Sequence, residues 1–125
     1  MPTSPYFFTS LLAGDTEIPH RAIVLATPPA DLPRGAVLGI VTASGKYVLS
    51  ASAAGDGSQV PNAILAFDVP ASAGADVPAA AYFMGEFVAE KLSFGAGHTA
   101  ATVEASFRSQ AAPIVVKSVG VIAYP

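Results

Sequence analysis

The sequence predicts a single mostly-β or α+β domain with one helix near its C-terminal end. Short runs of β-branched and aromatic residues alternate with turns rich in Gly, Pro and Ser, which is typical of short strands. Residues 99–111 alone have the apolar spacing of an amphipathic helix. With 125 residues the chain is long enough to bury one hydrophobic core, and it shows no internal repeat or separable second domain.

The prediction depends mainly on the stretch from Arg34 to Leu65. Two β-prone runs, Val37–Thr42 and Lys46–Ser50, flank Ala43-Ser44-Gly45, whose glycine can take the positive φ that a three-residue hairpin loop needs. These runs therefore predict a β-hairpin. A Gly-rich turn at Asp56–Ser58 then leads to a third predicted strand, Ala63–Asp68.

The segment from residue 79 to residue 94 permits two interpretations. Its glutamates have the spacing of a helix surface, but Gly85 lies at its centre and its aromatic and β-branched residues favour strands. We expect two extended pieces, Ala80–Met84 and Glu86–Leu92, separated by a bulge or bend at Gly85.

The predicted helix runs from Thr99 to Ala111. Thr99 is an N-cap residue by type, and Val103 and Phe107 lie four residues apart on one helix face. A proline two residues after the helix ends it, and the apolar run Ile114–Ile122 predicts a closing strand.

The N-terminal segment, residues 1–33, holds six of the eleven prolines, which break helices and interior strands. It contains two β-prone pieces, Tyr6–Thr9 and Ala22–Ala26. Either the segment packs loosely and its second piece joins the sheet, or Pro5 to Leu12 forms an extended arm that adds as a strand to another protein's sheet. Exposed aromatics favour the arm. We therefore divide the chain into an N-terminal arm and lead-in segment, 1–33, and a β-rich domain, 34–125.

Charge is scarce in this chain. Charged residues make up 12% of the sequence, against about 25% in typical soluble domains, and the mean hydropathy is +0.53. Either partner subunits cover part of the weakly polar surface, or the composition reflects only an alanine-rich coding bias. The net charge is −3, and the basic residues are scattered without forming a stripe, so we expect no nucleic-acid partner.

Other compositional signals narrow the cellular setting. The absence of cysteine removes disulfides and thiolate metal sites. No apolar run approaches the roughly 18 residues that a transmembrane helix needs, so we expect no membrane partner. The first 14 residues lack a cationic region before a short apolar stretch, which argues against a signal peptide. A cytosolic product that is built into a larger assembly fits these features.

Motifs for phosphate or metal binding are not convincing. Gly39 to Lys46 resembles a phosphate-binding loop, but its glycine spacing is one residue too long and Tyr47 replaces the Ser or Thr that would bind magnesium. The histidines, His20 and His98, lie in separate loops without carboxylates at ligand spacing. Asp56-Gly57-Ser58 lacks the alternating oxygen ligands of a calcium loop and indicates a tight turn. We expect no cofactor and no metal.

Catalytic motifs are also missing. The sequence has no Gly-x-Ser-x-Gly elbow and no cysteine nucleophile. A Ser/His/Asp set drawn from distant loops stays open, although no motif indicates one. Glu86 and Glu90 could form a carboxylate pair for glycoside chemistry, but solvated surface charge is the simpler interpretation. We expect that the protein is not an enzyme.

One set of spaced turn glycines and β runs resembles a known family. The segments are Arg34-Gly35-x-Val37-Leu38-Gly39, Gly45-Lys46-Tyr47, Asp56-Gly57-Ser58-Gln59-x-Pro61-x-Ala63-Ile64-Leu65 and Tyr82-x-x-Gly85-Glu86-Phe87. Over roughly residues 34–95 this arrangement is similar to the lambda-type head decoration proteins of tailed bacteriophages. The C-terminal helix followed by a strand is consistent with the same family.

The resemblance implies a β-clip-like, capsid-stabilising cement protein. Members of this family bind as homotrimers at local threefold positions on the exterior of the capsid, where N-terminal arms contact the major capsid protein. The protein would be made in the host cytoplasm and would reside in the virion. Carried onto this chain by position and composition, the capsid-binding arm consists of Pro5, Tyr6, Phe7, Phe8, Thr9, Ser10, Leu11 and Leu12.

Two other function classes compete with this interpretation. A small ligand-binding or enzymatic β domain would use a cleft near Asp56–Gln59 and Glu86, with convergent polar groups. A phage tail or bacterial surface adhesin module would bind cell-surface material instead of capsids.

Overall fold

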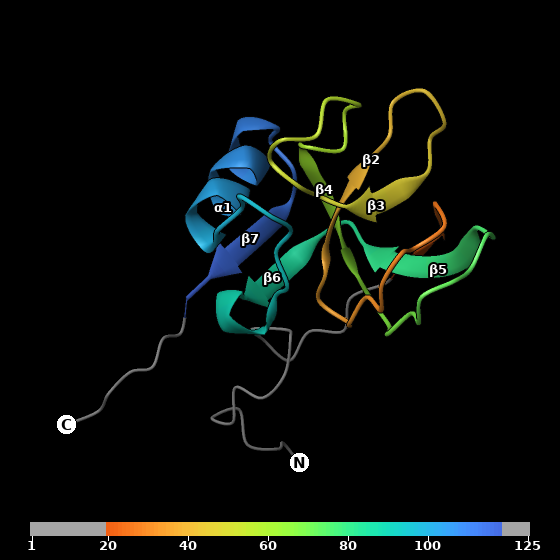
Figure 1. Cartoon of the computed structure of the whole chain (residues 1–125). Coiled ribbons are helices and arrows are strands. Elements are labelled where there is room, and N and C mark those ends of the chain that lie inside the picture. Colours follow the sequence, from red (N-terminus) through yellow and green to blue (C-terminus); the bar gives the residue numbers. More distant parts are fainter. Residues whose placement is uncertain (1–19, 119–125) are drawn as a thin grey trace, which may run out of the picture.

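The computed structural model describes residues 20–118, which form a mostly β structure with one α-helix (Figure 1). This confirms the predicted fold class. In chain order the elements are β1 (Arg21–Leu25), β2 (Val37–Ile40), β3 (Tyr47–Leu49), β4 (Pro61–Leu65), β5 (Val77–Tyr82), β6 (Gly85–Val88), the short 3-10 helix η1 (Ala89–Lys91), α1 (Ala100–Ser109) and β7 (Ile114–Lys117).

Five strands form a closed barrel in the order β1-β3-β2-β4-β5. The antiparallel pair β1–β5 closes it over five register positions, from Arg21↔Ala81 to Leu25↔Val77. The parallel pair β1–β3, in contrast, has a single register position, Leu25↔Tyr47. β1 therefore belongs to the barrel although it lies before residue 34, as the second β-prone piece of the N-terminal segment predicted. The division of the chain at residue 34 stays a prediction.

The predicted hairpin is confirmed. β2 and β3 pair antiparallel from Leu38↔Leu49 to Ile40↔Tyr47, and the Val41 amide donates to the Lys46 carbonyl (2.8 Å). Gly45 has a φ of 72°, as the loop interpretation required. The segment that resembles a phosphate loop is thus a strand, a turn and a strand, with no helix after it.

Most predicted strands have different bounds in the structure. The hairpin strands are shorter than predicted, since β2 ends at Ile40 and β3 spans Tyr47–Leu49, so their connection is longer than the predicted three residues. The strand predicted at Ala63–Asp68 begins earlier, at Pro61, and ends at Leu65. Proline fits the first position of a strand because it lacks an amide donor. The loop after the strand is held by Asp68, whose carboxylate accepts from the Arg34 amide at 2.6 Å. The piece predicted at Ala80–Met84 is β5, which begins earlier, at Val77, because pairing with β1 keeps these residues extended, and which ends at Tyr82.

Two extended pieces are present, as predicted, but the bend between them is at Phe83 and Met84, and Gly85, with a φ of 126°, is the first residue of β6. The prediction of a strand through Leu92 is wrong, because β6 ends at Val88 and Ala89–Lys91 form η1. β6 pairs in parallel with β7 over Gly85↔Ile114 to Val88↔Lys117. The closing strand is confirmed to Lys117, and the last part of its predicted range, 119–122, lies outside the described residues.

The helix α1 begins where the sequence predicted. The Thr99 side chain accepts from the Thr102 amide, and the Thr102 hydroxyl accepts from the Thr99 amide, which together form a reciprocal N-cap. The helix ends two residues earlier than predicted, at Ser109, and Ala111 has a φ of 56°. Val103 and Phe107 are both fully buried, as their spacing predicted.

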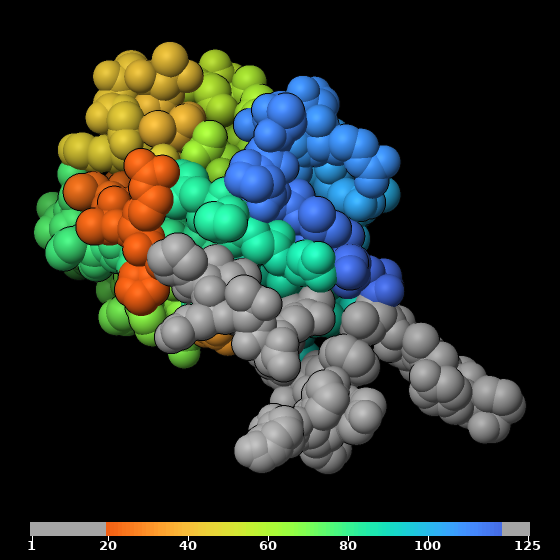
Figure 2. Space-filling view, turned by 180° about the vertical axis from the view of Figure 1, so that it is seen from behind, coloured from red at the N-terminus to blue at the C-terminus, as the bar shows by residue number. Residues whose placement is uncertain are grey.

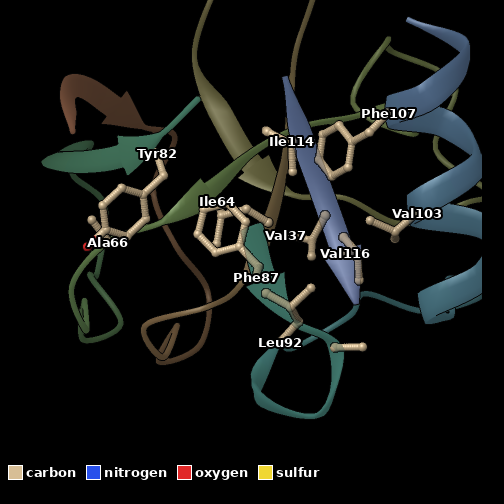
Figure 3. Close-up of a cluster of buried hydrophobic side chains, with 11 residues drawn as sticks. Val37, Ile64, Ala66, Tyr82, Phe87, Leu92, Val103, Phe107, Ile114 and Val116 are labelled. Atoms are coloured by element: carbon tan, nitrogen blue, oxygen red, sulfur yellow. The ribbon is translucent and has the colours of Figure 1, made fainter. Parts of the chain in front are cut away.

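Two hydrophobic clusters hold these elements together. One fills the barrel and includes Leu25, Leu38 and Leu65. The other lies between the barrel and α1, where Phe107 lies beside Ile114 and Val103 beside Val116 of β7, with Phe87 of β6 on the far side of that strand (Figure 3). The β6–β7 pair thus joins the helix to the outside of the barrel.

Candidate interaction surfaces

The serine and histidine that the fold brings together do not form a catalytic pair. The Ser50 hydroxyl donates to the Ser58 carbonyl at 2.7 Å, and Ser50 is fully buried. His98 Nε2 lies 3.2 Å from that hydroxyl but 2.9 Å from the Gln59 carbonyl, which can only accept. Nε2 must therefore carry the proton, and it cannot serve as a base for Ser50. His98 Nδ1 faces the Thr102 hydroxyl at 3.2 Å, where a triad would place a carboxylate.

This cluster instead joins two parts of the fold. Through His98 it links the loop after β3 to the N-terminal turn of α1. Sequence reasoning left a distant Ser/His/Asp set open. It could not specify Ser50 and His98 because 48 residues separate them.

The groups proposed for a ligand cleft are engaged within the protein. Asp56 Oδ1 accepts from the Ser58 amide (3.0 Å) and hydroxyl, as a tight turn requires. These hydrogen bonds from Ser58 lower the pKa of Asp56. Gln59 accepts from the Gly57 amide at 2.8 Å, while Glu86 pairs with Lys117 across the β6–β7 ladder at 2.9 Å.

The other residues considered for catalysis or metal binding also contact residues of the fold. Glu90 accepts a hydrogen bond from the Ser118 hydroxyl. Glu86, the other member of the considered carboxylate pair, bonds to Lys117. His20 packs edge-on against Phe67, with ring centroids 5.2 Å apart. Within residues 20–118, no three His, Asp or Glu side chains gather in a group that could hold a metal ion.

An ion pair between Lys46 and Asp76 links the β2–β3 turn to the loop before β5. The Asp76 carboxylate accepts from Lys46 Nζ, from the Thr27 amide (2.9 Å) and from the Thr27 hydroxyl (3.1 Å). The hydrogen bond from Lys46, followed by those from Thr27, lowers the pKa of Asp76 from 3.8 to about 2. Asp76 thus connects the loop before β5 to the end of β1 and to the hairpin.

The lowered pKa predicts a pH dependence of stability. Since the folded-state pKa lies below the unfolded value, Asp76 stabilises the fold above about pH 4, and this contribution is lost as the pH falls toward 2. We expect Asp76→Asn to lower the melting temperature at pH 7 and to reduce its decline between pH 5 and pH 2. Thermal denaturation followed by circular dichroism measures both effects.

The control for this prediction is Glu104→Gln, which removes a carboxylate from an exposed helix pair with Arg108. Such i,i+4 pairs contribute only about 0.3–0.5 kcal/mol, so the acid decline should stay close to that of the wild type. An Asp76→Asn protein with the full wild-type decline would show that the Lys46–Asp76–Thr27 contact does not stabilise the fold.

The described surface also carries exposed apolar side chains. Within residues 20–118, five large ones are 40–52% exposed, and they lie on different elements and loops: Val24, Val60, Phe67, Met84 and Val115. Scattered exposure of this kind is ordinary on protein surfaces and does not define a ligand pocket. Figure 2 shows a face of the barrel on which β1, in orange, adjoins the gold β2–β3 hairpin.

The predicted arm, Pro5 to Leu12, lies outside the described residues. The structure does place the point from which the N-terminal segment departs. His20 contacts Phe67, the most exposed of the large apolar side chains, and lies 6.3 Å from the Tyr82 ring between centroids. At the other end of the described region, Ser118 bonds to Glu90 on η1.

These observations define the class of protein. It is a small β-barrel module with one helix, and its described polar groups at the candidate sites bond within the fold. The family model for the bacteriophage lambda head decoration protein D matches residues 9–114. The chain therefore belongs to this family of structural phage head proteins, which are part of the virion capsid. No curated protein sequence matches it significantly.

The matched region includes all four segments that carried the resemblance, and it begins inside the predicted arm, at residue 9. The suspected family is thereby confirmed. Among the described residues, no helix has the length and apolar character that crossing a membrane requires.

Proposed function

We propose that this protein binds as a homotrimer at local threefold positions of the capsid exterior and cements the lattice of the major capsid protein. The observation that carries the proposal is the family match over residues 9–114. A cement protein gains affinity from many weak contacts, which three joined subunits multiply. The protein would be made in the host cytoplasm and would act without catalysing a reaction.

The surface chemistry of the described residues supports this role. Three of the six basic side chains, Lys46, Arg108 and Lys117, are paired with carboxylates, so a nucleic-acid partner finds little free positive charge. The exposed apolar side chains provide area that a neighbouring subunit or the shell can cover. A β-clip-like arrangement of the subunit stays part of the proposal.

The arm, Pro5 to Leu12, is proposed as the segment that contacts the major capsid protein by strand addition. Strand addition supplies backbone hydrogen bonds without requiring particular side chains. The arm's aromatic residues Tyr6, Phe7 and Phe8 would add apolar area to this contact. His20, the first described residue after this segment, lies beside the exposed ring of Phe67.

Deletion of residues 1–15 tests the proposal. We expect the shortened protein to keep its circular dichroism spectrum and cooperative melting, and to lose binding to expanded shells in a sedimentation assay. Removal of residues 1–4 alone, which spares Pro5 to Leu12, is the matched control and should leave binding intact. If the protein without residues 1–15 still sediments with shells as the wild type does, the arm is not the binding segment.

The same assay separates the competing function classes. A tail or adhesin module would bind host cells and not shells. A small ligand-binding or enzymatic β domain would bind neither. Occupancy of every threefold position, seen by electron microscopy of decorated shells, would support the trimer.

A further inference from the structure

We propose that a cavity beside the open edge of β1 binds the acidic segment Asp15–Glu17 of a second copy of this chain, as an added β-strand. This inference extends the proposed self-association by naming a contact between subunits. It rests on the geometry of β1, on the charges of the described residues and on the chemistry of the N-terminal segment.

The barrel has an incomplete seam between β1 and β3. The two strands share one register position, Leu25↔Tyr47, and the Ala26 amide donates to the Tyr47 carbonyl at 2.9 Å. Because backbone groups alternate in direction along a strand, those of Ala22 and Val24 point to the same side as those of Ala26. β3 begins only at Tyr47, level with Leu25, so within residues 20–118 the Ala22 backbone groups and the Val24 amide on that side have no strand partner and form an open edge.

A cavity of about 490 Å³ lies along this edge. Its walls are Arg21–Val24 of β1, the turn residues 44–46, and the rings of Tyr47 and Phe83. Val24 is 43% exposed, so the edge is accessible among the described residues. The site thus combines backbone hydrogen-bonding groups, apolar rings and positive charge, which together suit an extended acidic peptide.

Arg21 supplies the charge. Its guanidinium carbon lies 4.7 Å from the centroid of the Phe83 ring, which holds it over an aromatic face at the cavity wall. Lys46, the other cation of the site, is already paired with Asp76. Among residues 20–118, Arg21 and Lys91 are the basic side chains with neither a carboxylate nor a carbonyl partner, and Lys91 is not part of the cavity.

The carboxylates of the chain identify the occupant. All seven within residues 20–118 accept hydrogen bonds or pair with a cation: Asp31, Asp56, Asp68, Asp76, Glu86, Glu90 and Glu104. Of the nine acidic residues, this leaves Asp15 and Glu17, which flank Thr16 in the N-terminal segment. A strand of three or four residues is about 10–13 Å long, which matches Arg21–Val24.

A second copy is the better source of this segment than the same chain. His20, directly before β1, lies against Phe67 and Tyr82, whereas the cavity contains Tyr47 and Phe83. A segment that reached the β1 edge within one chain would have to reverse direction between Ile18 and His20. The segment of a neighbouring copy has no such constraint.

Cross-linking tests the contact directly, because the natural chain contains no cysteine. One full-length chain carries Thr16→Cys and another carries Val24→Cys, and the two are mixed, oxidised and separated by mass. We expect a mixed disulfide dimer, both at millimolar concentration and on decorated shells. Thr16→Cys mixed with Lys91→Cys, which places the thiol on η1 outside the cavity, is the control and should cross-link far less.

Charge reversal adds a second criterion. Arg21→Glu in the Val24→Cys chain should lower the yield of mixed dimer about fivefold, as expected for a lost ion pair of about 1 kcal/mol. Glu17→Arg in the Thr16→Cys chain should restore it. Recovery by the second reversal shows that the two charges meet, which a general loss of stability would not produce.

Three results would overturn the inference. These are no mixed dimer in either condition, equal yields with Val24→Cys and Lys91→Cys, and a disulfide that forms only within a chain carrying both Thr16→Cys and Val24→Cys. Shell binding is measured separately by sedimentation. Shell binding without the cross-link rejects this contact and leaves the proposed function standing. The cross-link without shell binding supports this contact and rejects the proposed function.

Discussion

Replacing Phe107 with alanine is expected to lower the free energy of unfolding by about 3–5 kcal/mol. Phe107 is fully buried in the cluster that joins α1 to β6 and β7. Figure 3 shows its ring close to Ile114. α1 also contacts β4 of the barrel, but less extensively than it contacts β7. Loss of the ring therefore leaves a cavity at the junction that attaches the helix.

Urea denaturation followed by circular dichroism measures this effect. The control is Arg108→Ala, at the next position of the same helix, where the side chain is exposed and pairs only with Glu104. That change should cost about 0.5 kcal/mol or less. A Phe107→Ala protein within about 1 kcal/mol of the wild type would contradict the central role of this cluster, since such losses are ordinary for surface changes.

Replacing Gly39 with alanine is expected to cost about 3 kcal/mol, at the upper end of the usual range for overpacking. A Cβ atom at Gly39 would lie 2.0 Å from the Ser58 carbonyl oxygen and 2.8 Å from its Cα. This obstacle is backbone, and it is held in place by hydrogen bonds to Ser50 and Asp56. Moving the loop away from β2 would break the bond from Ser50 and the bond from the Thr42 amide to the Asp56 carbonyl.

Gly55→Ala is the matched control, because a Cβ atom there meets nothing within 4 Å and its φ is not in the left-handed region. It should change stability by about 0.5 kcal/mol or less. Melting temperatures of the two variants give the comparison. Equal melting temperatures for Gly39→Ala and Gly55→Ala would show that the loop around Ser58 moves to accommodate a Cβ atom at residue 39 without loss of stability.

The sequence predicted the local elements well where neighbouring residues decide the structure. The hairpin around Gly45 and the helix that begins after Thr99 depend on turn chemistry, N-capping and apolar spacing within about ten residues. The end of β6 at Val88 was missed because η1 follows from packing around Leu92 and Ala89, which join the helix cluster. No local pattern distinguishes that turn from a continuing strand.

The candidate sites depended more strongly on distant contacts. The family resemblance could be recognised from spaced glycines, since each marks a turn or a close approach such as that of Gly39 to Ser58. The single-position pairing of β1 with β3, which opens the cavity at Arg21, could not be predicted. It results from how the barrel closes through β5.

The sequence alone determined that this is a mostly β protein with one capped helix, few charges and the turn pattern of a head decoration protein, because those features are written in residue type and spacing. Only the tertiary structure decided that Ser50 and His98 meet without forming a catalytic pair. It also decided that the described carboxylates bond within the fold, and that among the described residues Arg21 has no carboxylate partner at the edge of β1. Such pairings join residues far apart in the chain, and barrel closure brings them together.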